Sequence, residues 1–87
     1  MEFNDVKDFK QPIINILEEL GGSAKVKDIY EQLANSYPDL VNEPYWNEIV
    51  DNDLRWHDNI NRCRYQILKP QGILKNNSKK GTWELNR

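Results

Sequence analysis

The side chains best suited to recognise a ligand lie in the last third of the chain and are amides and cations. Asn59 and Arg62 are three residues apart, a spacing that places both on one face of a helix. An asparagine amide is complementary to the N6 and N7 edge of adenine, and an arginine fork to guanine O6 and N7 or to a phosphate. The pair therefore predicts contacts to duplex DNA. The alternatives are a solvated arginine and an asparagine bonded to the backbone at the start of a helix.

The neighbours of this pair extend the predicted contact surface. Base-reading contacts are expected from Trp56, His57, Asn59, Arg62, Tyr65 and Gln66. Contacts to the DNA backbone are expected from Arg55, Lys69, Lys75, Asn77, Ser78, Lys79 and Lys80. These side chains supply donors for phosphate oxygens, and each real phosphate contact steepens the salt dependence of binding by about 0.9 on logarithmic axes. The alternative for the lysine pair at 79–80 is a hairpin tip that only aids solubility.

Catalytic and metal-binding chemistry is poorly represented. Cys63 is predicted to face the core, six residues from His57, so the two would make a poorly arranged nucleophile and base. Pro38-Asp39 resembles the opening of a nuclease carboxylate motif, but no Asp/Glu-x-Lys triplet follows it. There is no Gly-rich phosphate loop, and one histidine with one cysteine excludes the usual zinc sites. We therefore expect a binding protein with no catalytic residues, no cofactor and no metal.

Length and composition indicate one small domain. The chain has 87 residues, of which 38% are hydrophobic and 30% charged. This balance is too apolar for a disordered chain and too polar for a membrane span. No run approaches the roughly 18 apolar residues that cross a bilayer, and no basic segment leads into an apolar one. We expect neither membrane contact nor a signal peptide, and the lone cysteine fits a reducing cytoplasm.

Charge is distributed unevenly along the chain. Residues 1–52 carry four lysines against eleven acids, a balance of −7. Residues 53–87 carry eight cations against three acids, a balance of +5, and the two halves give the net charge of −2. Such asymmetry predicts a molecule with one basic face and one acidic back. The alternative is a chance partition of surface charge in a small protein.

Hydrophobic spacing predicts three helices. The first covers residues 9–20, after a flexible polar lead-in over residues 1–8, and ends at two glycines. Asp8 with Gln11 has the spacing of a capping box for it. The second helix covers residues 26–37 and is ended by Pro38. The third runs from residue 56 or 58 to residue 69, and its predicted buried side consists of Ile60, Cys63, Ile67 and Leu68.

The remaining segments are predicted to be extended or irregular. Residues 23–26 form a short extended connector, and residues 38–54 form a loop with one short amphipathic turn. Residues 72–75 and 82–85 form two strands around the polar turn at 76–81.

This order of elements predicts an α+β winged helix-turn-helix over residues 9–87, with three helices followed by a C-terminal two-stranded β-wing. In that architecture the third helix enters a groove of duplex DNA and the wing contacts the flanking backbone.

The chain resembles the winged-helix domain at the N-terminus of Mrr-type restriction proteins, over roughly residues 10–86. Helical stretches that carry the resemblance are residues 14–22 and 26–34, followed by Asp58-Asn59 with Arg62. Its more specific parts are Leu68 to Gly72-Ile73-Leu74 and the wing segment Lys79-Lys80-Gly81-Thr82-Trp83-Glu84-Leu85. The chain departs from the family pattern at three positions, with His57 in place of an aromatic residue, Cys63 in place of Trp and Arg64 in place of Ala.

The resemblance implies the DNA-specificity module of a modification-dependent restriction endonuclease. The expected partners are double-stranded DNA and a nuclease domain in the same protein or complex. The resemblance also implies, as a separate prediction, that the DNA contains N6-methyladenine. Trp46 and Trp56 are the aromatic side chains expected to contact the methyl group. Their alternative role is to attach the long central loop to the body of the domain.

Two other functions are compatible with the same fold. A winged helix can be a protein-interaction module, here with an acidic face that docks a basic partner. It can also be a small transcriptional regulator, which predicts a dimer and a palindromic DNA site.

Overall fold

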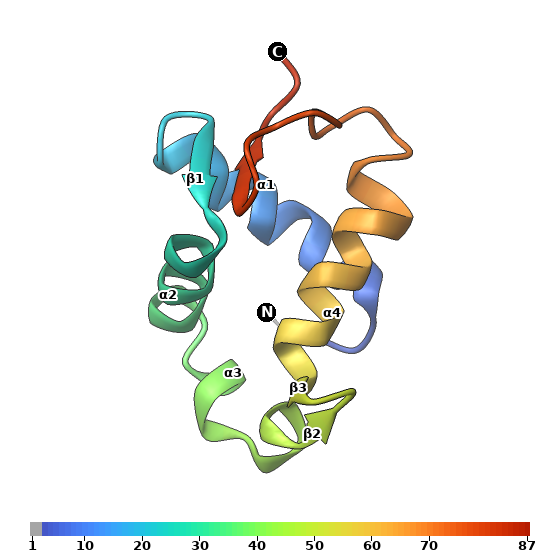
Figure 1. The fold of residues 1–87 in the computed structure, drawn as a ribbon. Coiled ribbons are helices and arrows are strands. Elements are labelled where there is room, and N and C mark those ends of the chain that lie inside the picture. Colours follow the sequence, from blue (N-terminus) through green and yellow to red (C-terminus); the bar gives the residue numbers. More distant parts are fainter. Residues whose placement is uncertain (1–2) are drawn as a thin grey trace.

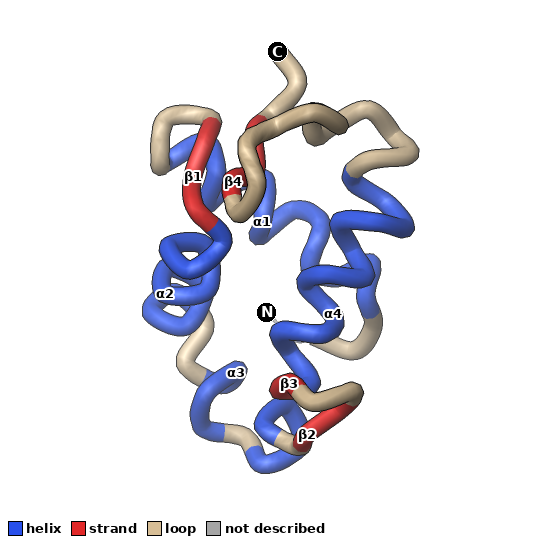
Figure 2. Tube along the Cα trace, in the orientation of Figure 1, coloured by secondary structure: helices blue, strands red, loops and turns tan. Residues whose placement is uncertain are grey.

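The computed structural model describes residues 3–87, which form one α+β domain (Figure 1). Its helical segments are η1 (Val6–Phe9), α1 (Lys10–Glu19), α2 (Val26–Ser36), α3 (Asp39–Asn42), η2 (Pro44–Asn47), α4 (Arg55–Cys63) and η3 (Arg64–Leu68). Its strands are β1 (Ser23–Lys25), β2 (Ile49–Val50), β3 (Asp53–Leu54) and β4 (Thr82–Glu84). Figure 2 shows the strands as two separate pairs at opposite ends of the domain. None of the described helices is long and apolar enough to cross a membrane.

The start of the domain is structured, which corrects the expected flexible lead-in over residues 3–8. Asp5 caps η1, and its carboxylate and that of Asp8 form the capping box, so the expected box of Asp8 with Gln11 is wrong. Phe3 is buried and stacks on Phe9 with ring centroids 4.5 Å apart. An aromatic anchor and a satisfied cap therefore hold this segment on the core. The first two residues of the predicted lead-in lie outside the described residues.

The first two predicted helices are confirmed by their packing. In α1, Ile13, Ile16 and Leu17 are buried, and in α2, Ile29 and Leu33 are buried. These positions follow the helical period, so each helix turns one apolar stripe toward the common core. The core formed by all the elements consists of Phe3, Phe9, Ile13, Ile16, Leu17, Ile29, Leu33, Leu40, Trp46, Trp56, Ile60, Cys63, Leu68, Leu74, Trp83 and Leu85.

The connector between α1 and α2 is a strand that pairs with the end of the chain. In this antiparallel pair Ser23, Ala24 and Lys25 lie opposite Glu84, Trp83 and Thr82. The predicted C-terminal hairpin is present only in part, because its first arm contributes an isolated bridge between Leu74 and Leu85. The Lys75 N–H donates to the Glu84 carbonyl at 2.9 Å and extends this contact. Strand β4 therefore lies between β1 and the short arm at residues 73–75.

The predicted loop over residues 38–54 is wrong for most of its length. It contains α3, η2 and a tight β2–β3 hairpin, in which Ile49 lies opposite Leu54. Asp51 and Asn52 form the two-residue turn with φ of 52° and 70°. Two left-handed residues give the turn type whose twist matches that of a hairpin, and Asp and Asn adopt it more readily than other non-glycine residues.

The third predicted helix is confirmed, but it begins at Arg55 and changes its winding. Residues 55–63 are α-helical, and residues 64–68 form a π-helical continuation. Ile60, Cys63 and Leu68 are buried, as predicted, and Ile67 is partly buried. The wider turn after Cys63 shifts the positions of the last side chains around the helix axis.

Candidate nucleic-acid interface

The predicted base-reading residues divide into three groups by exposure. Arg62, Tyr65 and Gln66 are exposed, His57 and Asn59 are half-buried, and Trp56 is buried. Tyr65 is the exposed large hydrophobic side chain of this helical segment, with 62% of its surface accessible. The exposed residues lie on one side of α4 and η3, so this part of the predicted surface is brought together.

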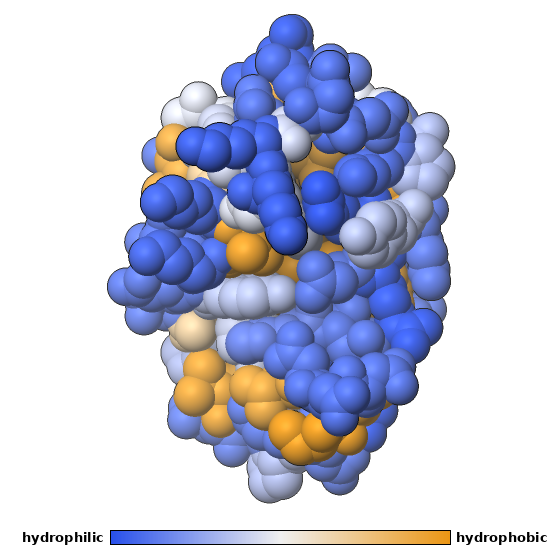
Figure 3. Space-filling view, in the orientation of Figure 1, coloured by the Kyte–Doolittle hydropathy of each residue, from blue (hydrophilic) through white to orange (hydrophobic). Residues whose placement is uncertain are grey.

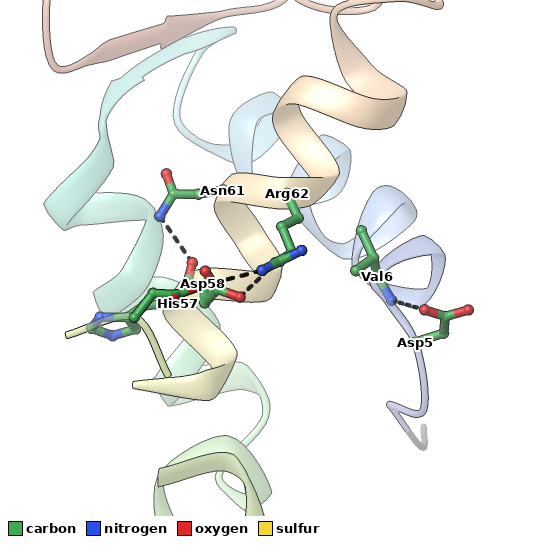
Figure 4. A network of polar contacts seen from close by, with 7 residues as sticks. Asp5, Val6, His57, Asp58, Asn61 and Arg62 are labelled. Atoms are coloured by element: carbon green, nitrogen blue, oxygen red, sulfur yellow. Dashed lines mark hydrogen bonds and ion pairs between the residues drawn. The ribbon is translucent and has the colours of Figure 1, made fainter. Parts of the chain in front are cut away.

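Arg62 is held by acids of its own chain (Figure 4). Its Nε donates to Asp58 at 2.6 Å, one helical turn earlier, and its Nη2 lies 3.5 Å from Asp51 in the β2–β3 turn. The hydrogen bond and charge of Asp58 raise the pKa of the guanidinium, with a smaller contribution from Asp51. The side chain is about half exposed, so these ion pairs are weak and can be exchanged for a phosphate or a base edge.

His57 belongs to a contact between α4 and α2. Its ring stacks on Tyr30 with centroids 4.0 Å apart, and its Nδ1 lies 3.1 Å from the Asp53 carboxylate. Asn61 donates to the Tyr30 hydroxyl at 2.9 Å and to the His57 carbonyl at 2.9 Å. Burial lowers the pKa of His57 and outweighs the opposing effect of Asp53. His57 therefore positions α4 on α2 and has only one ring edge left for a ligand.

The two tryptophans expected to contact a methyl group are part of the core. Trp46 is 3% exposed and packs edge to face on Phe9, with centroids 5.7 Å apart. Trp56 is 4% exposed and packs in the same way on Tyr30. Neither indole offers an open face, so the prediction that they contact a methylated base is wrong, as is base reading by Trp56. Their packing fits the alternative, in which they attach the central segment to the body.

Three of the side chains predicted to contact the DNA backbone are either paired with an acid of the same chain or buried. Arg55 donates to the Glu48 carboxylate at 2.5 Å, and its guanidinium lies 4.3 Å from the Tyr45 ring centroid. Lys75 lies 3.4 Å from Glu84. The Ser78 hydroxyl oxygen is buried, so the predicted phosphate contact by this atom is wrong.

Other cations have no carboxylate partner within the described part of the chain: Arg64, Lys69, Lys79 and Lys80. Arg64 and Lys69 flank the exposed Tyr65 ring, at 5.5 Å and 5.4 Å from its centroid. Asn77 is exposed in the loop that leads to the two lysines. These cations lie at two places, with Lys69 directly after η3 and the exposed Lys79 and Lys80 in the loop before β4. Arg64 is half-buried, because its Nε is buried and its guanidinium lies 5.1 Å from the Trp83 ring centroid.

The predicted division into a basic face and an acidic back is wrong. Glu48 and Asp51 of the first half pair with Arg55 and Arg62 of the second, because the β2–β3 hairpin packs beside the start of α4. Two lysines of the acidic half, Lys25 and Lys27, share a surface pocket with Lys79 and Lys80. Sequence reasoning missed them, although the Lys-x-Lys spacing at the start of a predicted helix was a usable signal.

The lone cysteine, Cys63, is buried in the core. Burial raises the pKa of the Cys63 thiol to about 11, and a protonated, buried thiol is a poor nucleophile. Residues 3–87 also contain no cluster of three His, Cys, Asp or Glu side chains that could hold a metal ion.

Comparisons with known proteins find no match for the chain among protein-family models, curated proteins or solved structures. The resemblance to the Mrr-type winged helix therefore stays a prediction.

Proposed function

We propose that the chain is a winged-helix domain that binds duplex DNA, with α4 and η3 facing a groove and the loop before β4 on the phosphate backbone. The observation that supports it most is a set of cations, Lys69, Lys79 and Lys80, that have no acidic partner among residues 3–87. Lys69 lies beside the exposed Tyr65 ring, on the helical segment that also carries the exposed Arg62 and Gln66. Cations beside polar and aromatic groups on a helix are the combination that positions a protein on phosphates and reads base edges.

The topology supports the same proposal. Strand β1 follows the first long helix and pairs with β4, so the last strand is fixed beside the start of α2. The end of the loop at 76–81 is consequently held close to the body, beside β1 and the start of α2, where the Val26 N–H donates to the Gly81 carbonyl at 2.9 Å (Figure 1). A wing in this position can follow the backbone that flanks a helix in the groove.

The test is binding of a fluorescent 20-base-pair duplex by anisotropy at several salt concentrations. The parent should bind with a steep salt dependence, and Lys79→Gln with Lys80→Gln should weaken binding and reduce the slope by about 0.9 for each lost contact. The matched control is Lys7→Gln with Lys10→Gln, which removes the same charge from η1 and the start of α1. Absence of parent binding at low salt would overturn the proposal.

A gain-of-function variant tests the role of α4 separately. Asp51→Asn removes one acid beside Arg62 and keeps a residue type that tolerates the turn at φ 52°. Duplex affinity should rise roughly twofold to fivefold, the scale of an exposed ion pair, because a negative charge leaves the interface. The gain should disappear when Arg62→Ala is added. An unchanged affinity for Asp51→Asn would place Arg62 outside the interface.

The finer role, as the specificity module of a modification-dependent restriction enzyme, is proposed from the sequence resemblance alone. Trp46 and Trp56, the two aromatic side chains expected to contact the methyl group of N6-methyladenine, are buried. Asn59 remains the candidate contact for a preference for this base. Paired duplexes with and without the methyl group test this preference, and equal affinities would remove it.

A second candidate function is protein interaction. Val41, Tyr45 and Ile49 are exposed by 50%, 52% and 69%, and hydrophobic side chains gather at the end of the molecule formed by α3 and the β2–β3 hairpin (Figure 3). Acidic residues Glu43 and Glu48 accompany them. A partner that binds this end should lose affinity with Ile49→Ser and be unaffected by changes at Lys79 and Lys80.

A further inference from the structure

Four lysines from distant parts of the chain line one surface pocket of about 440 Å³. Lys25 is the last residue of β1, Lys27 lies in the first turn of α2, and Lys79 and Lys80 precede β4. The other lining residues are Val26, Gly81 and Thr82.

Backbone hydrogen bonds hold the two lysine segments together. Val26 N–H donates to the Gly81 carbonyl at 2.9 Å, and Thr82 N–H donates to the Lys79 carbonyl at 2.9 Å. Lys25 also lies opposite Thr82 in the β1–β4 pair. The lysine positions are therefore set by the fold, although their side chains are flexible at their ends.

The charge of the pocket has no internal compensation in the part of the chain that the structure describes. No carboxylate lies within ion-pair distance of any of the four lysines, whereas Arg55, Arg62, Lys75 and Arg87 each have an acidic partner. Asp28 is the acid nearest to Lys27 along the chain, and it does not line the pocket. Four like charges around one hollow repel one another and favour a multiply charged anion between them.

Gly81, one of the residues that line the pocket, leaves open space in front of its backbone. Gly81 has φ of +80°, and a Cβ built there would meet no atom within 4 Å. A group can thus approach the backbone closely at this position. Hydrophilic side chains cover this end of the molecule, in contrast to the hydrophobic end formed by α3 and β2 (Figure 3).

We propose that this lysine pocket binds neighbouring phosphates of the duplex backbone, which together supply several negative charges, with Lys25 and Lys27 as contacts that sequence reasoning did not assign. The inference rests on the proposed DNA-binding function and adds a second anchor, at the junction of β1 and α2. Lysines bind phosphates as point charges without reading bases. The pocket therefore contributes affinity and salt dependence equally for every DNA sequence.

The first experiment measures duplex affinity against salt for the parent, Lys25→Gln with Lys27→Gln, and the control Lys7→Gln with Lys10→Gln. The pocket variant should lose about 0.9 from the slope for each phosphate contact removed, on every duplex sequence, and the control should lose less. Lys25→Arg with Lys27→Arg should keep the parental slope. Circular dichroism and thermal unfolding establish that these exposed changes leave the fold intact.

The second experiment separates this inference from the proposed function. Inorganic tripolyphosphate is titrated into the parent, and the amide signals of Lys27, Asp28, Gly81 and Thr82 are followed by NMR. Shifts at these amides that vanish in the Lys25/Lys27 glutamine variant support the pocket, even if the parent binds no duplex. A parent that binds duplex while the glutamine variant keeps both its slope and its tripolyphosphate shifts overturns the pocket and leaves the proposed function standing. A parent that neither binds duplex nor shows shifts with tripolyphosphate overturns both the pocket and the proposed function.

Discussion

The polar side chains of α4 are already engaged in contacts within the chain. Arg62 shares its charge with Asp58 and Asp51, and His57 is stacked on Tyr30. The sequence predicts correctly that Arg62 lies on the exposed side of this helix. It does not predict Asp51 as a partner, because that contact depends on a hairpin that folds back eleven residues earlier in the chain.

His57 makes the stability of the domain depend on pH. Burial lowers its pKa from the ordinary value of 6.5, while Asp53 opposes the shift and Tyr30 covers one ring face. Because the folded pKa lies below the unfolded one, protonation favours the unfolded chain. The contribution of neutral His57 is complete above pH 6.5 and is lost as the pH falls through its folded pKa.

Urea unfolding at pH 7.5 and pH 5.5 tests this prediction. The parent should have a lower free energy of unfolding at pH 5.5, and His57→Gln should show a smaller difference between the two pH values. Carboxylates with ordinary pKa values near 4 contribute little in this window. The same pH dependence in both proteins would contradict the role given to His57.

The helices and the extended segments at β1 and β4 are predictable from the sequence, but the pairing of β1 with β4 and the β2–β3 hairpin are not. In α1, α2 and α4 the apolar residues recur at helical spacing, and each helix buries that stripe. Strand β1 has only three residues, and its partner β4 lies more than fifty residues later, so no local pattern identifies the pair. The β2–β3 hairpin has two residues in each arm, too few to show a two-residue period.

The turn of the β2–β3 hairpin provides an element-scale prediction. Asn52 has φ of 70°, a conformation that β-branched residues adopt only with strain. Asn52→Val should destabilise the domain by about 1–3 kcal/mol, measured by chemical denaturation. Asn52→Gly is the control, and it should be neutral or stabilising because Asp-Gly is a preferred sequence for this turn. Equal stability of the two variants would mean that this hairpin does not form.

At the scale of the whole molecule, the cations are distributed differently from the prediction. A contiguous basic surface over the last third of the chain would need Arg55 and Arg62 to be free, yet acids hold both. Four lysines without an acidic partner in residues 3–87, Lys25, Lys27, Lys79 and Lys80, instead share a pocket where β1, α2 and the loop before β4 meet. Hydrophobic side chains gather at the end formed by α3 and the β2–β3 hairpin (Figure 3). Net charge along a sequence does not reveal such an arrangement, because the fold brings its two halves together.

The packing of Phe3 on the core provides a test of how the start of the chain is joined to the rest of the molecule. Phe3 is 8% exposed and contacts Phe9 and Tyr37, so it joins the first segment to α2. Phe3→Ala should lower the free energy of unfolding by about 3 kcal/mol. In a domain of this size that corresponds to a fall in Tm of at least about 10 °C by calorimetry. Phe3→Leu should lose less, and an unchanged Tm in the alanine variant would mean that the segment does not pack on the core.

The buried thiol of Cys63 can report how often the folded domain opens locally. A water-soluble disulfide reagent reaches this sulfur only when α4 separates from the core, so the labelling rate measures how often the domain opens. A cysteine introduced on an exposed loop would react far sooner. A fluorophore can therefore be attached selectively to that introduced cysteine in the folded protein, without first removing Cys63.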